Sequence, residues 1–153
     1  MLDPRRQPGF QLAVGLRGLL ERRHARQEAA SLARQQGALL FGQDSRTALA
    51  AYERAARHDP DDIWTLYFIG DLQRTLGDLP AAHQAYRQAA ALAAKQSLEK
   101  PQDFEAQHDL ALSHIKIGDV LVAQGDRSGA LAAYRKGLAI REKLAARAPA
   151  NTE

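Results

Sequence analysis

Side chains that could carry catalysis or hold a metal are scattered along these 153 residues rather than clustered. No two of the five histidines stand four residues apart, the spacing that places two metal ligands on one face of a helix. His108, Asp109 and His114 come closest to a cluster, but hydrogen-bonded or exposed histidines are the more frequent case in such a segment. We therefore expect neither a metal site nor a bound cofactor.

Residues for nucleophilic or acid–base catalysis are equally sparse. Cysteine is absent, which excludes disulfides, thiolate ligands and cysteine nucleophiles. The glycines belong neither to a phosphate-binding loop nor to a Gly-x-Ser-x-Gly nucleophile turn. Asp59, Asp61 and Asp62 form the one tight group of carboxylates, and their place before a helix favours capping over catalysis. We expect no enzymatic activity.

Basic residues are concentrated at the start of the chain, with ten arginines against five acids up to Arg57. Such a start raises nucleic acid or anionic lipid as partners, although a solvated helix surface explains it more simply. The acidic balance after Arg57 argues against nucleic acid. Arg17 interrupts the apolar stretch from Phe10 to Leu20, which is too short and too charged for a signal peptide or a membrane span. We expect a cytoplasmic protein.

Two segments of the chain are copies of each other at an offset of 48 residues, the distance from Gly70 to Gly118. A match over so many positions indicates an internal repeat of the kind found in helical solenoids. The repeated positions that we expect to be structural are Gly70, Gly77, Ala82, Tyr86 and Ala89 in the first copy, and Gly118, Gly125, Ala130 and Tyr134 in the second.

A third, weaker copy lies upstream. Ala48, Tyr52 and Ala55 precede Ala82, Tyr86 and Ala89 by 34 residues. The first half of this copy looks degenerate, because Gln36 and Gln43 stand where the later copies have glycine.

Each copy has the pattern of two helices joined by a tight turn. Gly70 and Gly118 are small residues where two helices can cross closely, and Tyr86 and Tyr134 are large enough to fill the space between hairpins. Gly77 and Gly125 fit the left-handed position that ends a helix. The aspartate after each of these glycines can cap the next helix.

This pattern resembles the tetratricopeptide-repeat family, and the 34-residue spacing and the Asp59-Pro60 ending support the resemblance. The resemblance, closest to the long repeats of bacterial proteins, covers residues 28–149. It implies an all-α fold, a short right-handed solenoid of about three hairpins at 28–60, 61–100 and 101–149. Residues 1–27 form a basic tail and an extra N-terminal helix over 10–26, which is either separate from or continuous with the next helix.

The later copies are 14 residues longer than the 34-residue repeat, which is about four helical turns. Shared between neighbouring helices, these residues add about two turns to each. We expect helices at 28–41, 45–58, 62–76, 79–97, 103–124 and 127–147. Pro101 ends the run between the two long helices.

A resemblance to this family implies that the first helix of each hairpin lines a groove that binds a protein or peptide. The residues carried over to that groove are Trp64, Tyr67, Asp71, Arg74, Leu112, Ile115, Asp119 and Val122. Trp64 is the only tryptophan and the best anchor, since tryptophan, tyrosine and arginine carry much interface binding energy. The alternative is that Trp64 packs in the core.

Some family members bind C-terminal carboxylates through a clamp of basic and amide side chains. The matching positions hold Ala33, Gly37, Phe68, Leu112 and Lys116, of which only Lys116 has the right chemistry. We expect no carboxylate clamp, and a groove suited to a helix or an extended apolar peptide. The function implied is a non-catalytic scaffold or adaptor.

Both ends of the chain could carry further contacts. The last helix bears Leu131, Leu138, Ile140 and Leu144, and no solvating helix follows it in the sequence, so an uncovered face there suggests a homo-oligomer. At the other end Leu12, Leu16, Leu19 and Leu20 share one side of a helix. We expect this segment to cap the first hairpin; the alternative is a membrane-surface adaptor anchored by an Arg-rich amphipathic segment.

Overall fold

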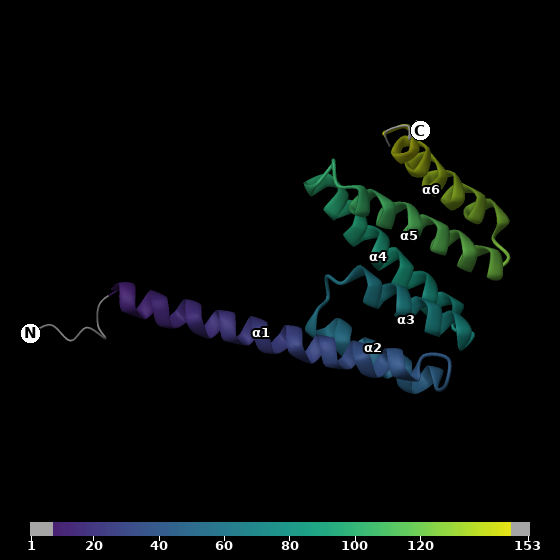
Figure 1. Cartoon of the computed structure of the whole chain (residues 1–153). Coiled ribbons are helices and arrows are strands. Elements are labelled where there is room, and N and C mark those ends of the chain that lie inside the picture. The colour runs from purple at the N-terminus through teal and green to yellow at the C-terminus, as the bar shows by residue number, and fades with distance from the viewer. Residues whose placement is uncertain (1–7, 148–153) are drawn as a thin grey trace, which may run out of the picture.

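A computed structural model describes residues 8–147 and consists there of six α-helices joined by short turns, with no strand in that range (Figure 1). The helices pair into three hairpins, as the repeats predict. Their bounds are α1 (Pro8–Leu40), α2 (Ser45–His58), α3 (Ile63–Thr75), α4 (Leu79–Glu99), α5 (Phe104–Ala123) and α6 (Arg127–Arg147).

Helix lengths confirm where the additional residues of the later copies go. Helices α2 and α3 have 14 and 13 residues, whereas α4 and α5 have 21 and 20. The additional length is therefore shared equally, at about two turns per helix. Because both helices lengthen together, their packing faces keep the same angular register along the pair.

A left-handed glycine and an aspartate cap form the turn inside each hairpin. Gly42, Gly77 and Gly125 all have a φ of 84°, a conformation that side chains larger than hydrogen rarely adopt. In the second turn, Asp78 accepts a hydrogen bond from the backbone N–H of Ala81 at 3.1 Å and so begins α4. Asp44 and Asp126 play the same part at the start of α2 and α6.

The prediction that the first copy lacks its glycines is wrong. Gly37 and Gly42 do the work that Gln36 and Gln43 were expected to leave undone. A Cβ on Gly37 would lie 2.6 Å from the Tyr52 ring, as one on Gly70 would lie 2.4 Å from the Tyr86 ring. Both glycines are displaced by one residue from the strict 34-residue offset, so that comparison passes over them.

A tyrosine ring seated on a glycine is thus the common unit of all three hairpins. Gly118 carries Tyr134 in the same way, with a Cβ-to-ring distance of 2.4 Å. The methyl group of an alanine would overlap the ring at each of these positions, so the two helices of a hairpin could not approach as closely.

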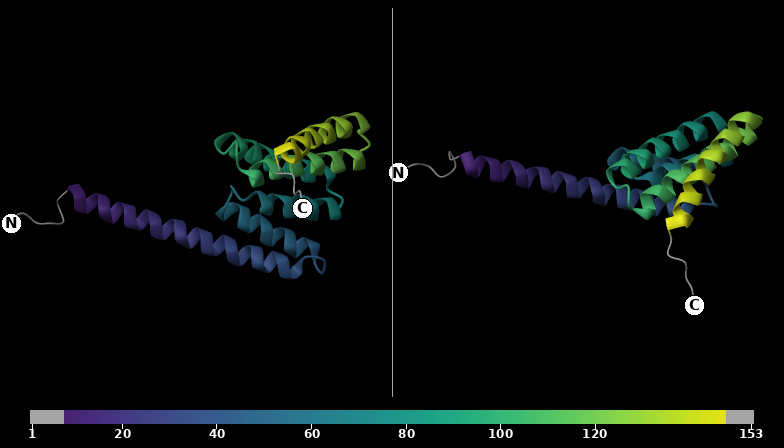
Figure 2. Two further views of the ribbon diagram at one scale, coloured as in Figure 1. Left: turned by 45° about the horizontal axis from the view of Figure 1, so that its top comes forward. Right: turned by 90° about the horizontal axis from the view of Figure 1, so that it is seen from above.

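Each helix packs chiefly on the helices before and after it in the sequence, which is the arrangement of a solenoid (Figure 2). The main core lies between α2 and α5. It is built from the two seated tyrosines, small alanines and a few larger residues: Tyr52, Tyr86, Ala82, Ala89, Ile63, Leu66, Ile69, Leu72 and Val120.

The N-terminal part of α1 projects beyond the body of the solenoid (Figures 1 and 2). Leu12, Leu16, Leu19 and Leu20 are all more than half exposed. The expectation that this segment caps the first hairpin is wrong, because α1 is one continuous helix that extends past the end of α2. We call its residues 8–28 the overhang; the side chains of Phe10 and Val14 lie outside the described residues.

Candidate partner-binding surface

A polar cluster joins the second and third hairpins on the side formed by α3 and α5. The Lys116 ammonium group donates to both oxygens of Asp71, at 2.8 and 2.9 Å. The Tyr86 hydroxyl donates to the same carboxylate at 2.6 Å. Lys116 also lies over the rings of Tyr67 and Tyr86, with centroid distances of 5.6 and 5.4 Å. Three helices, α3, α4 and α5, are thereby held in one register.

Tyr67 is the second anchor of this cluster. Its hydroxyl donates to the Asp109 backbone oxygen at 2.7 Å and lies 2.8 Å from the Ser113 hydroxyl oxygen. Burial raises the pKa of Tyr67 well above its usual value, and burial followed by the hydrogen bond to Asp71 does the same for Tyr86. Both hydroxyls therefore stay protonated and donate over the whole physiological pH range.

The same unit recurs one repeat later without its cation. Tyr134 donates to Asp119 at 2.7 Å, as Tyr86 donates to Asp71. In the part of the chain that the structure describes, no lysine or arginine forms an ion pair with Asp119. Lys116 reaches Asp71 from the following hairpin, and α6 is the last described helix.

The structure divides the eight residues assigned to the groove into two groups. Tyr67 is fully buried and Asp71 is occupied by Lys116, so both act within the fold. Leu112 and Ile115 are half-buried. The exposed members are Trp64, Arg74, Asp119 and Val122.

Trp64 offers the largest exposed ring of this group, with 51% of the residue accessible. The alternative that it packs in the core is therefore wrong. Its ring meets Tyr67 edge-on, with centroids 5.5 Å apart. Because Tyr67 is fixed by hydrogen bonds to α5, the indole rests on a rigid base.

A second exposed aromatic residue lies at the start of α5, where the sequence comparison gave no signal. Phe104 stacks on His108, with centroids 6.3 Å apart, and is 59% exposed. This turn belongs to the additional length of α5 beyond the matched repeat, so no repeat position marks it. We call Trp64, Arg74, Phe104, Asp119 and Val122 the α3–α5 face.

An arginine fixes the turn between the first two hairpins. Arg34 donates to Asp62 at 2.9 Å and to Asp59 at 3.2 Å. Asp62 also caps α3 by accepting from the Trp64 N–H at 3.2 Å. Capping was expected for this carboxylate group, whereas the arginine partner, 25 residues away from Asp59, was not.

The five positions that would form a carboxylate clamp contribute to packing or ion pairing instead. Ala33 and Gly37 are buried against the first hairpin, Phe68 stacks on Tyr52 with centroids 4.8 Å apart, and Leu112 packs on the core. The Lys116 ammonium group is held by Asp71.

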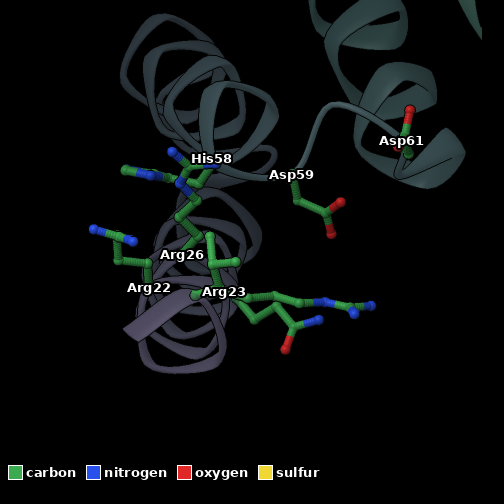
Figure 3. A pocket seen from close by; sticks show the side chains of 8 residues that line it. Arg22, Arg23, Arg26, His58, Asp59 and Asp61 are labelled. Atoms are coloured by element: carbon green, nitrogen blue, oxygen red, sulfur yellow. The ribbon is translucent and has the colours of Figure 1, made fainter. Parts of the chain in front are cut away.

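A hollow of about 500 Å³ lies where the overhang leaves the end of α2 (Figure 3). Arg22, Arg26 and His58 gather on one side of it, and Asp59 and Asp61 lie on the other. Since both signs of charge line the hollow, it has no clear preference for an anion or a cation.

Neither metal binding nor membrane crossing has a site among the described residues. Within residues 8–147, no three histidine, aspartate or glutamate side chains are grouped so that they could hold a metal ion. None of the helices in that range has both the length and the apolar character required to span a bilayer.

No family model matches the sequence, and no curated protein matches it. Solved structures do match the fold. The N-terminal domain of stress-induced protein-1 from C. elegans matches with a TM-score of 0.64 and 19% identity, over 80% of this chain and 96% of that domain.

Two crystal structures of MamA also match, with TM-scores of 0.63 and 0.65 and identities of 22% and 21%. They cover 77% and 82% of this chain, which spans 61% of the length of MamA. The chain is thus similar in fold to tetratricopeptide-repeat proteins, and the expected all-α repeat fold is confirmed.

Proposed function

We propose that this chain is a non-catalytic scaffold that binds a protein or peptide partner on its α3–α5 face. The exposed Trp64 ring, seated on the immobile Tyr67, is the observation that supports this proposal. A rigid aromatic side chain loses little conformational entropy on binding, and tryptophan is among the residues that most often dominate interface energy.

The surroundings of Trp64 suggest the kind of partner. Phe104 and Val122 add exposed apolar area on α5, while Arg74 and Asp119 supply one charge of each sign. A mixed face of this kind suits an amphipathic helix or an extended peptide with alternating apolar and polar residues. It offers no concentrated charge for a phosphate backbone.

Trp64→Ala is expected to weaken partner binding by about tenfold or more, since truncation of a central interface tryptophan typically costs about 2 kcal/mol. Partners captured by the wild-type chain from the source cell would be identified, purified and titrated against each variant by calorimetry. Arg74→Ala tests the same face with a second exposed side chain. Tyr67 is unsuitable for this purpose because its removal would disturb the fold.

Leu98→Ala is the matched control, because Leu98 is 82% exposed at the end of α4 and lies outside the α3–α5 face. This variant should bind like the wild type. Equal affinity of the Trp64, Arg74 and Leu98 variants for the same partner would exclude the α3–α5 face as the binding surface.

The overhang supports a second candidate function, that of a membrane-surface adaptor. It exposes four leucines, Leu12, Leu16, Leu19 and Leu20, together with Arg22, Arg23 and Arg26. Exposed leucines beside arginines are the combination by which interfacial helices bind anionic bilayers. A single exposed helix of this kind gives weak, salt-sensitive binding.

We expect the full chain to float with vesicles rich in phosphatidylglycerol at low salt if this second function is correct. Leu16→Glu with Leu19→Glu should abolish flotation, because two charges would enter the apolar side of the overhang. Leu98→Glu should float like the wild type. Absence of wild-type flotation would exclude the adaptor function and leave the α3–α5 face untouched.

A further inference from the structure

The positions that join consecutive hairpins inside the solenoid can be recognised from the crossing glycine of each first helix. They stand five residues before that glycine and two residues after it. In α3 they are Thr65 and Leu72, and in α5 they are Ser113 and Val120; all four are fully or almost fully buried. The preceding helix, α2 or α4, covers them.

The same two positions on α1 hold leucines that nothing described covers. Counted from Gly37, they are Leu32 and Leu39, and they are 62% and 75% exposed. Interior positions are therefore filled here by larger apolar side chains, and yet they face solvent. This is the open N-terminal face of the solenoid.

The opposite end exposes the complementary helix face. Leu131 and Leu138 stand 48 residues after His83 and Ala90 of α4. His83 and Ala90 border a surface hollow shared with His114, Ile117 and Leu121 of α5. On α6 the corresponding leucines are 49% and 55% exposed.

The internal pair α4–α5 fixes how these two faces would meet. Lys116 lies over the Tyr86 ring, so these residues are opposite each other in an antiparallel pair. A step of seven residues along α4 from Tyr86 reaches Ala93, and the same step back along α5 from Lys116 reaches Asp109.

Transferred to α6 and α1, this register gives a consistent set of contacts. Tyr134 would face Gln35, whose amide could donate to Asp119 as Lys116 donates to Asp71. Leu131 would meet Leu39, and Leu138 would meet Leu32. At the position of Ala93 stands Arg141, and at that of Asp109 stands Glu28, so opposite charges come together.

We propose that copies of this chain associate head to tail, with α1 of one copy packing on α6 of the next as α5 packs on α4. The partner is a second copy because one chain carries both faces, with leucine against leucine and Arg141 against Glu28. The contact is heterologous, so each junction leaves one open face at either end and the assembly can grow beyond a dimer. The junction lies apart from the α3–α5 face and does not depend on the proposed partner.

Sedimentation velocity of the full chain tests this arrangement. The wild-type mass should rise beyond that of a dimer as the concentration approaches about 100 µM, where a junction with a micromolar Kd is largely occupied. Leu32→Glu with Leu39→Glu blocks the α1 face, and Leu131→Glu with Leu138→Glu blocks the α6 face. Each double variant alone should be monomeric, and circular dichroism should show that both keep their helices, because the four side chains are exposed.

The mixture of the two double variants is the decisive sample. One intact α1 face and one intact α6 face remain, so a heterodimer should form and stop at two chains. An isologous contact through α1 or α6 alone would instead leave one double variant dimeric by itself. That result, a monomeric wild type at about 100 µM, or no complex in the mixture would overturn the proposal.

A charge exchange tests the register. Glu28→Arg should weaken association by roughly fivefold, the effect of about 1 kcal/mol at a partly exposed pair. Adding Arg141→Glu to the same chain should restore it, because the exchanged charges meet again at every junction. No recovery in the double variant would overturn the proposed register.

Discussion

Tyr86→Ala is expected to lower the free energy of unfolding by about 3–5 kcal/mol, the usual cost of truncating a buried aromatic side chain. The Tyr86 ring is 1% exposed and fills the space above Gly70, where a Cβ would lie only 2.4 Å away. Its loss leaves a cavity between α3 and α4 and removes the hydrogen bond to Asp71 at 2.6 Å. Urea denaturation followed by circular dichroism measures the change.

Tyr134→Ala is the matched comparison, since Tyr134 has the same glycine contact and the same kind of hydrogen bond one repeat later. Tyr134 is half-buried rather than buried, and no described helix follows α6 to enclose it. We expect a loss of about 1–2 kcal/mol, because water already reaches part of the ring and little cavity forms. Equal losses in the two variants would contradict the view that the following hairpin, rather than the tyrosine unit itself, confers the stability.

Lys116→Met is expected to destabilise the chain by roughly 1–3 kcal/mol, because it leaves the half-buried Asp71 carboxylate with one hydrogen-bond donor in place of two. Methionine keeps most of the side-chain volume over the two tyrosine rings, so the loss reports on the charge. Thermodynamic coupling is measured with Asp71→Leu and the double variant. The double variant should be less destabilised than the sum of the singles, since replacing both partners leaves no unpaired charge.

Lys95→Met supplies the control for that cycle. Lys95 and Glu99 are 4.0 Å apart with side chains 70% and 59% exposed, so solvent screens this pair and the change should be within about 0.5 kcal/mol. If Lys116→Met were as mild as Lys95→Met, the Asp71 cluster would not be what joins the second and third hairpins.

Much of the architecture could be predicted because local chemistry decides it. Gly77 and Gly125 must occupy a left-handed position, and Asp78 and Asp126 cap the helices that follow, so these turns are visible in the sequence. The predicted helix at 127–147 coincides with α6, and that at 79–97 ends two residues before α4 does. The first hairpin was misjudged because its glycines are displaced by one residue relative to a strict offset.

The binding surface was harder to predict because burial depends on distant partners. Nothing near Tyr67 in the sequence shows that Ser113 and Asp109 will bury its hydroxyl, nor that Lys116 will occupy Asp71. Trp64 is exposed for a related reason: α3 ends its contact with α5 at Tyr67, three residues along the helix. The overhang was misplaced because α2 is too short to cover all of α1.

The packing of each helix on its neighbours in sequence also bears on how the protein folds as it is made. A ribosome adds about 5–20 residues per second, whereas short-range helical contacts form in far less than a second. The first hairpin can therefore close as soon as α2 has left the ribosome, without waiting for residues that come much later. Each newly completed hairpin then exposes one uncovered apolar helix face until the next helix arrives. At any moment during synthesis, little more than that single face is open to aggregation.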